Sequence, residues 1–124
     1  EVSPGKAEPY ANRGDTKREK GDMDGAIKDY TKAILFRPEY VEAYNGRGIA
    51  RAVKGDLDGA IADFSKTISL NPKHTDAYNN RGNVKLSKGE LKGALDDFNR
   101  AVELKPDFTN ARKRAEELKK LLAK

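Results

Sequence analysis

The chain of 124 residues is long enough for one modest hydrophobic core, and its composition excludes several protein classes. It contains no cysteine, which excludes disulfides and thiolate metal sites, and no apolar run approaches the ~18 residues that a membrane span needs. The formal net charge is +5, and residues 109–124 supply most of it, with six basic and two acidic side chains. These features predict a soluble protein and leave open whether it is cytoplasmic or, after loss of a signal peptide, periplasmic or secreted.

From residue 7 onward the sequence repeats at an interval of 34 residues. The segment "GDMDGAIKDY" starts at Gly21, "GDLDGAIADF" at Gly55 and "GELKGALDDF" at Gly89. The same interval relates other aromatic, glycine, alanine and proline positions, which are Tyr10, Tyr44 and Tyr78; Gly14, Gly48 and Gly82; Ala26, Ala60 and Ala94; Tyr30, Phe64 and Phe98; Pro38, Pro72 and Pro106. Such a period predicts an array of similar units, here 7–40, 41–74 and 75–108, after a flexible segment 1–6 and before a tail 109–124.

Each unit reads as two antiparallel helices joined by a short turn. A glycine stands near its centre and a proline near its end, and both residue types terminate helices. The segments between them carry apolar residues at steps of three and four, such as Ile61, Phe64 and Ile68, which is the spacing of one helix face. A hairpin of this size cannot bury its apolar face alone, so the units are expected to stack.

Two further features of the repeat predict contacts between the paired helices. Glycine inside a helix is unfavourable by about 1 kcal/mol relative to alanine. Gly14, Gly48 and Gly82 are therefore expected to allow close approach of the second helix, at Ala26, Ala60 and Ala94. An arginine and an aspartate stand eight residues before and after each central glycine, which predicts the ion pairs Arg13–Asp29, Arg47–Asp63 and Arg81–Asp97.

The tail 109–124 reads as a capping helix. Ala111, Ala115, Leu118 and Leu122 form an apolar stripe, and the opposite side is mostly charged. Such a helix would cover the exposed face of the third unit and present a polar side to water.

The stretch "AYNNRGNVKLSKGELKGALDDFNRAVELKPDF" (77–108) resembles a tetratricopeptide repeat (TPR). The resemblance covers 7–108 in three units, and 109–124 is similar to the solvating helix of that family. It implies an all-α, right-handed superhelical solenoid of three antiparallel helix hairpins plus a capping helix. It also implies a non-enzymatic scaffold whose first helices line a concave groove for a peptide or a partner protein.

Transferring the family's groove positions to this sequence gives a set of candidate binding residues. The set is rich in asparagine, whose amide can both donate to and accept from a peptide backbone. Its members are Asn12, Asn45, Ile49, Val53, Asn79, Asn80, Asn83, Leu86, Asn110, Lys113 and Arg114, with Asp15, Glu19 and Gly46 at neighbouring groove positions. The apolar members and the basic tail predict a peptide ligand with an apolar anchor and an acidic flank. The chaperone-binding branch of the family grips an acidic C-terminus with a five-residue clamp, of which only Asn80 and Arg114 are matched, in a frame shifted by one unit.

The sequence also bears on three other functional classes. An enzyme is not expected, because the one histidine, His74, falls in a turn where we expect it to be solvated, and no catalytic, metal or cofactor motif surrounds it. Binding of nucleic acid or another polyanion remains the alternative, favoured by the pI of 9.4 but opposed by aromatic residues that the repeat uses for packing. A spacer role within a larger protein also stays open, and the partner and the oligomeric state are not predicted.

Overall fold

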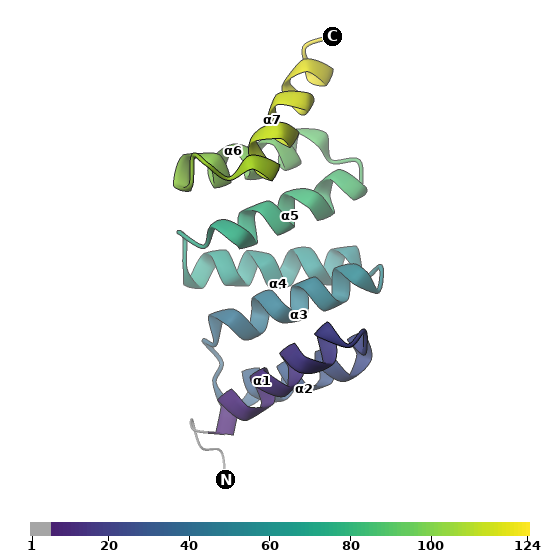
Figure 1. The fold of residues 1–124 in the computed structure, drawn as a ribbon, viewed down its shortest axis with the longest axis vertical. Coiled ribbons are helices and arrows are strands. Elements are labelled where there is room, and N and C mark those ends of the chain that lie inside the picture. The colour runs from purple at the N-terminus through teal and green to yellow at the C-terminus, as the bar shows by residue number, and fades with distance from the viewer. Residues whose placement is uncertain (1–5) are drawn as a thin grey trace.

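The computed structural model describes residues 6–124, and within them the chain forms seven α-helices and no strand. Of the expected flexible segment 1–6, residues 1–5 lie outside the described residues. The helices are α1 (Ala7–Glu19), α2 (Met23–Phe36), α3 (Val41–Val53), α4 (Leu57–Leu70), α5 (Thr75–Ser87), α6 (Leu91–Leu104) and α7 (Thr109–Leu122). They stack in chain order into an elongated array with its two ends far apart (Figure 1), which confirms the predicted all-α repeat solenoid.

Three antiparallel pairs, α1 with α2, α3 with α4 and α5 with α6, make up the body of the array, and α7 packs on α6. Each pair is joined by a turn whose glycine has a positive φ, of 89° at Gly21, 90° at Gly55 and 81° at Gly89. Glycine adopts this left-handed conformation without the steric cost that a Cβ would add. None of the helices between residues 6 and 124 combines the length and the apolar character needed to cross a membrane.

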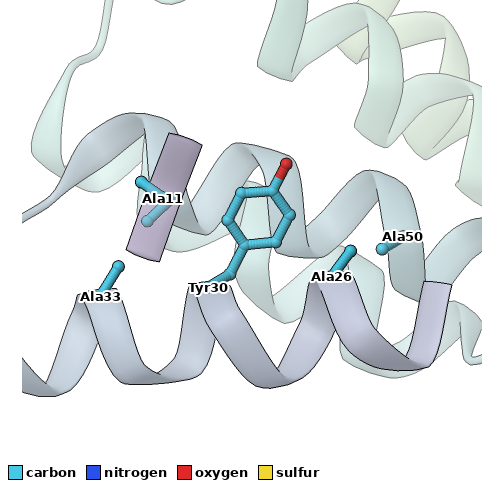
Figure 2. Close-up of a cluster of buried hydrophobic side chains, with 6 residues drawn as sticks. Ala11, Ala26, Tyr30, Ala33 and Ala50 are labelled. Atoms are coloured by element: carbon cyan, nitrogen blue, oxygen red, sulfur yellow. The ribbon is translucent and has the colours of Figure 1, made fainter. Parts of the chain in front are cut away.

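Each hairpin is built around one buried aromatic ring from its second helix. Tyr30, Phe64 and Phe98 are almost completely buried, and Figure 2 shows the ring of Tyr30 above α2 among small side chains, namely Ala11, Ala26, Ala33 and Ala50. A Cβ built on the helical glycine of the first helix would lie 2.9 Å from Tyr30 Cε1 at Gly14, 2.7 Å from Phe64 Cε1 at Gly48 and 2.8 Å from Phe98 Cε1 at Gly82. The expected close approach at these glycines is therefore made by the aromatic ring of the second helix, which is the group nearest to each of them.

The predicted ion pair is present in all three hairpins. In each, the arginine Nε and Nη2 donate to the two carboxylate oxygens of one aspartate, at 2.8 and 2.8 Å for Arg13–Asp29, 3.0 and 2.8 Å for Arg47–Asp63, and 2.9 and 2.7 Å for Arg81–Asp97. A second cation approaches each buried carboxylate, with Lys17 at 3.1 Å, Arg51 at 2.9 Å and Lys85 at 3.2 Å. The hydrogen bonds from Arg13 lower the pKa of Asp29.

The same arginines link neighbouring hairpins. Arg47 Nη1 donates to Thr31 Oγ1 on α2, and Arg81 Nη1 donates to Ser65 Oγ on α4, both at 3.1 Å. The side chain of Arg47 is consequently 14% exposed, whereas that of Arg13, which has no described helix in front of it, is 55% exposed.

Helix α7 covers α6 with part of its predicted stripe. Ala111, Ala115 and Leu118 are buried against the Phe98 cluster, but Leu122 is 40% exposed. Including Leu122 in the buried stripe was therefore wrong, because the last turn of α7 projects beyond α6 (Figure 1).

Candidate functional site

A hollow of about 140 Å³ opens between α3 and α5 and brings together four of the predicted groove residues. Ile49 and Val53 are four residues apart on α3, and Asn80 and Asn83 are three apart on α5, so each pair shares one helix face. The hollow is lined by Ile49, Ala52, Val53, Phe64, Asn80, Asn83 and Val84. Its wall is mainly apolar, with two amides at one side.

The amides around this hollow are incompletely hydrogen-bonded. Asn80 Nδ2 donates to Asn45 Oδ1 at 3.4 Å, which joins α5 to α3. In the described part of the chain, the Oδ1 atoms of Asn79 and Asn83 are buried and have no hydrogen-bond partner. A buried acceptor without a donor costs about 1–3 kcal/mol, so Asn83, which lines the hollow, favours a molecule that supplies an N–H group.

Three predicted residues in the middle of the array take other places. Asn45 and Asn79 are buried, at 9% and 8% exposure, and do not line the hollow. Leu86 packs against the Phe98 cluster in the third hairpin.

The remaining predicted residues lie toward the two ends of the array. Asn12 is exposed on α1. Asn110, Lys113 and Arg114 line a second, more polar hollow of about 320 Å³ with Glu117 on the first turns of α7. Within residues 6–124, neither Lys113 nor Arg114 has a hydrogen bond or an ion-pair partner, so both charges are available.

The first hairpin presents different chemistry at equivalent positions. The hydroxyl of Tyr30 donates to Asp15 and accepts from Arg18 Nε at 3.1 Å. Burial, followed by the hydrogen bond to Asp15, raises the pKa of Tyr30 to about 12. One repeat further on, Ile49 and Ala52 occupy the places of Asp15 and Arg18, so the polar cluster of the first hairpin gives way to the apolar hollow.

The surroundings of His74 show that the expectation of a solvated histidine was wrong. Its side chain is 10% exposed and not solvated, because Nδ1 accepts from the Ala77 N–H at 3.1 Å and Nε2 lies 3.0 Å from Glu42 Oε2. With Nδ1 as acceptor, the proton resides on Nε2 and is donated to Glu42. His74 thus caps α5 and ties it to α3; its position directly before the predicted helix was the signal that could have indicated this role.

The repeat tyrosines of the first helices are engaged with cations. Each ring lies below two basic side chains, namely Arg13 and Lys32 for Tyr10, Arg47 and Lys66 for Tyr44, and Arg81 and Arg100 for Tyr78. Tyr10 also stacks on Phe36 with ring centroids 5.5 Å apart. Rings held in this way are not free to stack on bases as single-strand-binding proteins require.

Comparison with known proteins gives family matches and similar folds. A tetratricopeptide repeat model matches residues 75–108, and a TPR repeat model matches residues 14–54. Among curated protein sequences none matches this chain.

Three solved structures illustrate the similarity. The first TPR of Spaghetti (RPAP3), bound to the HSP90 peptide SRMEEVD, is 27% identical with a TM-score of 0.94, over 99% of this chain and 98% of that one. The first TPR domain of human RPAP3 is 26% identical with a TM-score of 0.91, over 98% and 95% of the two chains. MamA is 26% identical with a TM-score of 0.92, over 98% of this chain and 71% of that one.

Proposed function

Because this chain belongs to the tetratricopeptide repeat family, we propose that it is a non-catalytic interaction module that binds an extended segment of a partner protein along α1, α3, α5 and α7. The observation that carries the proposal is the hollow between α3 and α5. There Ile49 and Val53 offer an apolar surface to one side chain, and Asn80 and Asn83 offer amides to the adjoining peptide backbone.

The size and surroundings of the hollow define the class of ligand. A volume of about 140 Å³ is close to the ~150 Å³ of an apolar cavity that holds one benzene molecule, so it suits a single aliphatic or aromatic side chain. The unpaired Lys113 and Arg114 lie on α7, at the end of the proposed groove, and favour carboxylates nearby. The ligand is thus a peptide with an apolar anchor and an acidic flank.

The sequence of the peptide in the similar Spaghetti complex agrees with this class. SRMEEVD contains the apolar residues Met and Val beside two Glu and one Asp. Three of the five clamp positions in the shifted frame do not match the family's clamp in this chain, and they hold Asn45, Ile49 and Asn110. We therefore assign a larger share of the binding free energy to the apolar anchor than in relatives that have the complete clamp.

Selection from a phage-displayed library of random peptides tests the proposal without knowledge of the partner. We expect enriched peptides to carry an apolar residue next to acidic ones. Changing Asn80 and Asn83 together to Ala should weaken their binding at least about tenfold, or ~1.4 kcal/mol, through loss of roughly one hydrogen bond each. The melting temperature should stay nearly unchanged, and Asn99→Ala on α6 is the matched control. Absence of any enriched peptide, or unchanged affinity of the double variant, would refute the proposal.

The polyanion alternative makes a different prediction. It places the contact on the basic outer side of α7, where Lys119 and Lys120 are exposed. The variant with Lys119→Glu and Lys120→Glu should leave binding of the selected peptides unchanged. If it abolishes binding of a single-stranded oligonucleotide while the asparagine variant does not, the surface of α7 is the functional site instead.

A further inference from the structure

The helices at the two ends of the proposed groove carry opposite charges. Asp15 and Glu19 on α1 occupy the positions that Ile49 and Val53 occupy on α3. On α7, Lys113 and Arg114 stand one turn earlier in the repeat, and Glu117 stands at the position of Asp15. The order along the array is therefore acidic, apolar, amide and basic. Resting on the function proposed above, we propose that the groove selects a charge-polarised peptide, with a basic end on α1, an apolar side chain in the hollow and an acidic end on α7.

The acidic end of the groove retains free charge. The carboxylate of Asp15 accepts from the Tyr30 hydroxyl and lies 3.7 Å from Arg18 Nη2, and its side chain is still half exposed. Glu19 is exposed one turn later and has no ion-pair partner among residues 6–124. Arg18 offsets one of these two negative charges, so Glu19 is the principal acceptor for a ligand cation.

The basic end is the mirror image of this arrangement. Lys113 and Arg114 are both exposed, and Glu117 is the one carboxylate that lines the same hollow. Neither cation is paired with a residue in the described part of the chain. Two cations against one carboxylate leave this end with a net positive charge.

The spacing of the helices sets the length of the ligand. Packed helices lie about 8–10 Å apart, so the three steps from α1 to α7 span roughly 27 Å. An extended peptide advances about 3.3 Å per residue, which makes its charged ends roughly eight residues apart. The hollow between α3 and α5 lies in the middle of this span and places the apolar anchor near the centre of the peptide.

Charge at the ends of a groove acts mainly on orientation and selectivity. Opposite charges steer a peptide into register, and a peptide laid in the wrong orientation puts like charges together at both ends. The apolar and amide contacts in the middle do not depend on this order of charges. The change of charge along the groove, called the grading below, can therefore be tested separately from binding itself.

Three synthetic nine-residue probes of identical composition make that test. Two carry Leu at the centre, two Lys at one end and two Glu at the other, in the two possible chain directions; the third keeps the central Leu and alternates the charges. At low salt the better of the two polarised probes should bind at least about fivefold tighter than the alternating probe, and the advantage should shrink as salt rises. Equal affinity of all three probes would overturn the inference.

A charge-reversed protein then locates the effect. Glu19→Lys should remove the advantage of the polarised probe, and replacing the two Lys of that probe by Glu should restore its affinity for the variant. Glu39→Lys, in the exposed turn between α2 and α3, is the matched control. It should leave the advantage of the polarised probe unchanged and should not raise the affinity for the probe with Glu in place of Lys. If Glu19→Lys leaves the preference intact, the grading is refuted, while loss of binding in the Asn80 and Asn83 variant would still support the proposed function. If no probe binds, the inference fails and the library selection alone decides the proposed function.

Discussion

The ring of Tyr30 in the first hairpin lies against the backbone of Gly46 in the second. A Cβ on Gly46 would stand 2.5 Å from Tyr30 Cζ and 2.8 Å from its hydroxyl oxygen, so the residue at this position cannot carry a side chain while Tyr30 keeps its place. At the next junction the equivalent residues are Phe64 and Asn80, which line the hollow together. The Tyr30 ring and its hydroxyl, which Phe64 lacks, therefore occupy the space that a side chain at position 46 would need.

This relationship predicts coupling between the two positions. Gly46→Asn would continue the row of Asn12 and Asn80 through the second hairpin, but in the wild-type background it should destabilise by about 1–3 kcal/mol through overpacking. In a Tyr30→Phe background the contact with the hydroxyl oxygen is removed, and the same change should be milder. A double-mutant cycle in urea should yield an interaction energy of at least about 0.5 kcal/mol; additive effects would contradict the prediction.

Alkaline pH should destabilise the protein through Tyr30. Burial raises its pKa to about 12, whereas an unfolded tyrosine titrates near ~10, so the folded state holds the phenolic proton more tightly. The associated stability is complete below about pH 10 and is lost as pH rises toward the folded value, by at most ~2.7 kcal/mol.

Comparison with Tyr30→Phe measures this effect. Between about pH 10 and 12 the free energy of unfolding should fall more steeply for the wild type than for the variant, because the other titrating groups are shared. Absorbance of the phenolate in the folded wild type should show a late-titrating tyrosine that the variant lacks. Parallel pH profiles would rule out this role for Tyr30.

The sequence predicted the fold well because the features that determine it repeat. Three copies of one pattern in register identified the helices, and the eight-residue offsets of Arg and Asp identified the pairs now seen at 2.7–3.0 Å. The site was predicted less completely, because a groove depends on the departures from the repeat. The contacts of Tyr30 with Asp15 and Arg18 depend on side chains that only the first hairpin has, so no spacing indicates them. The capping role of His74 also belongs to one hairpin, and its place directly before a helix is the one signal of it.

The Arg–Asp pairs should contribute differently to the free energy of unfolding, according to how far solvent reaches the arginine. Arg47 is held between Asp63 and α2 with 14% of its side chain exposed, while Arg13 is largely open to solvent. Asp63→Asn removes the carboxylate that binds both Arg47 and Arg51 and should cost about 1–3 kcal/mol, although Arg51 keeps Asp56 at 3.9 Å. Asp29→Asn should cost less, since solvent screens Arg13. Urea denaturation of the two variants tests this order, and equal losses would contradict it.

Substitutions at Gly48 test the contact between backbone and ring. The sequence alone predicts that Ala is much milder than Leu, because Ala recovers helix propensity. The structure adds that even a Cβ would lie 2.7 Å from Phe64 Cε1, so Ala also forces the ring to move. We expect Gly48→Leu to cost about 1–3 kcal/mol or more, and Gly48→Ala to lower the melting temperature by a smaller but measurable amount. Identical melting of the two variants would show that Gly48 is not a contact position.

The junctions between α2 and α3 and between α4 and α5 share an ion pair, called the clasp below, that the junction between α6 and α7 lacks. Lys54 pairs with Asp24, and Lys88 pairs with Asp58, so each cation directly after a first helix holds the start of the preceding second helix. The repeat register places Leu122 and Lys92 at the corresponding positions. The end of α7 is therefore held by the packing of Leu118 and not by charge.

Installing the missing clasp should strengthen the end of α7. The double change of Lys92→Asp with Leu122→Lys creates the pair found at the other two junctions and should add about 0.2–1 kcal/mol, the range of an exposed ion pair. Amide hydrogen exchange should show the last two turns of α7 exchanging faster than the ends of α3 and α5 in the wild type, and more slowly in the double variant. The single change Lys92→Asp is the matched control and should leave exchange in α7 unaltered. If α7 already exchanges as slowly as α5, the charge clasp is not what distinguishes the junctions, and packing alone sets their stability.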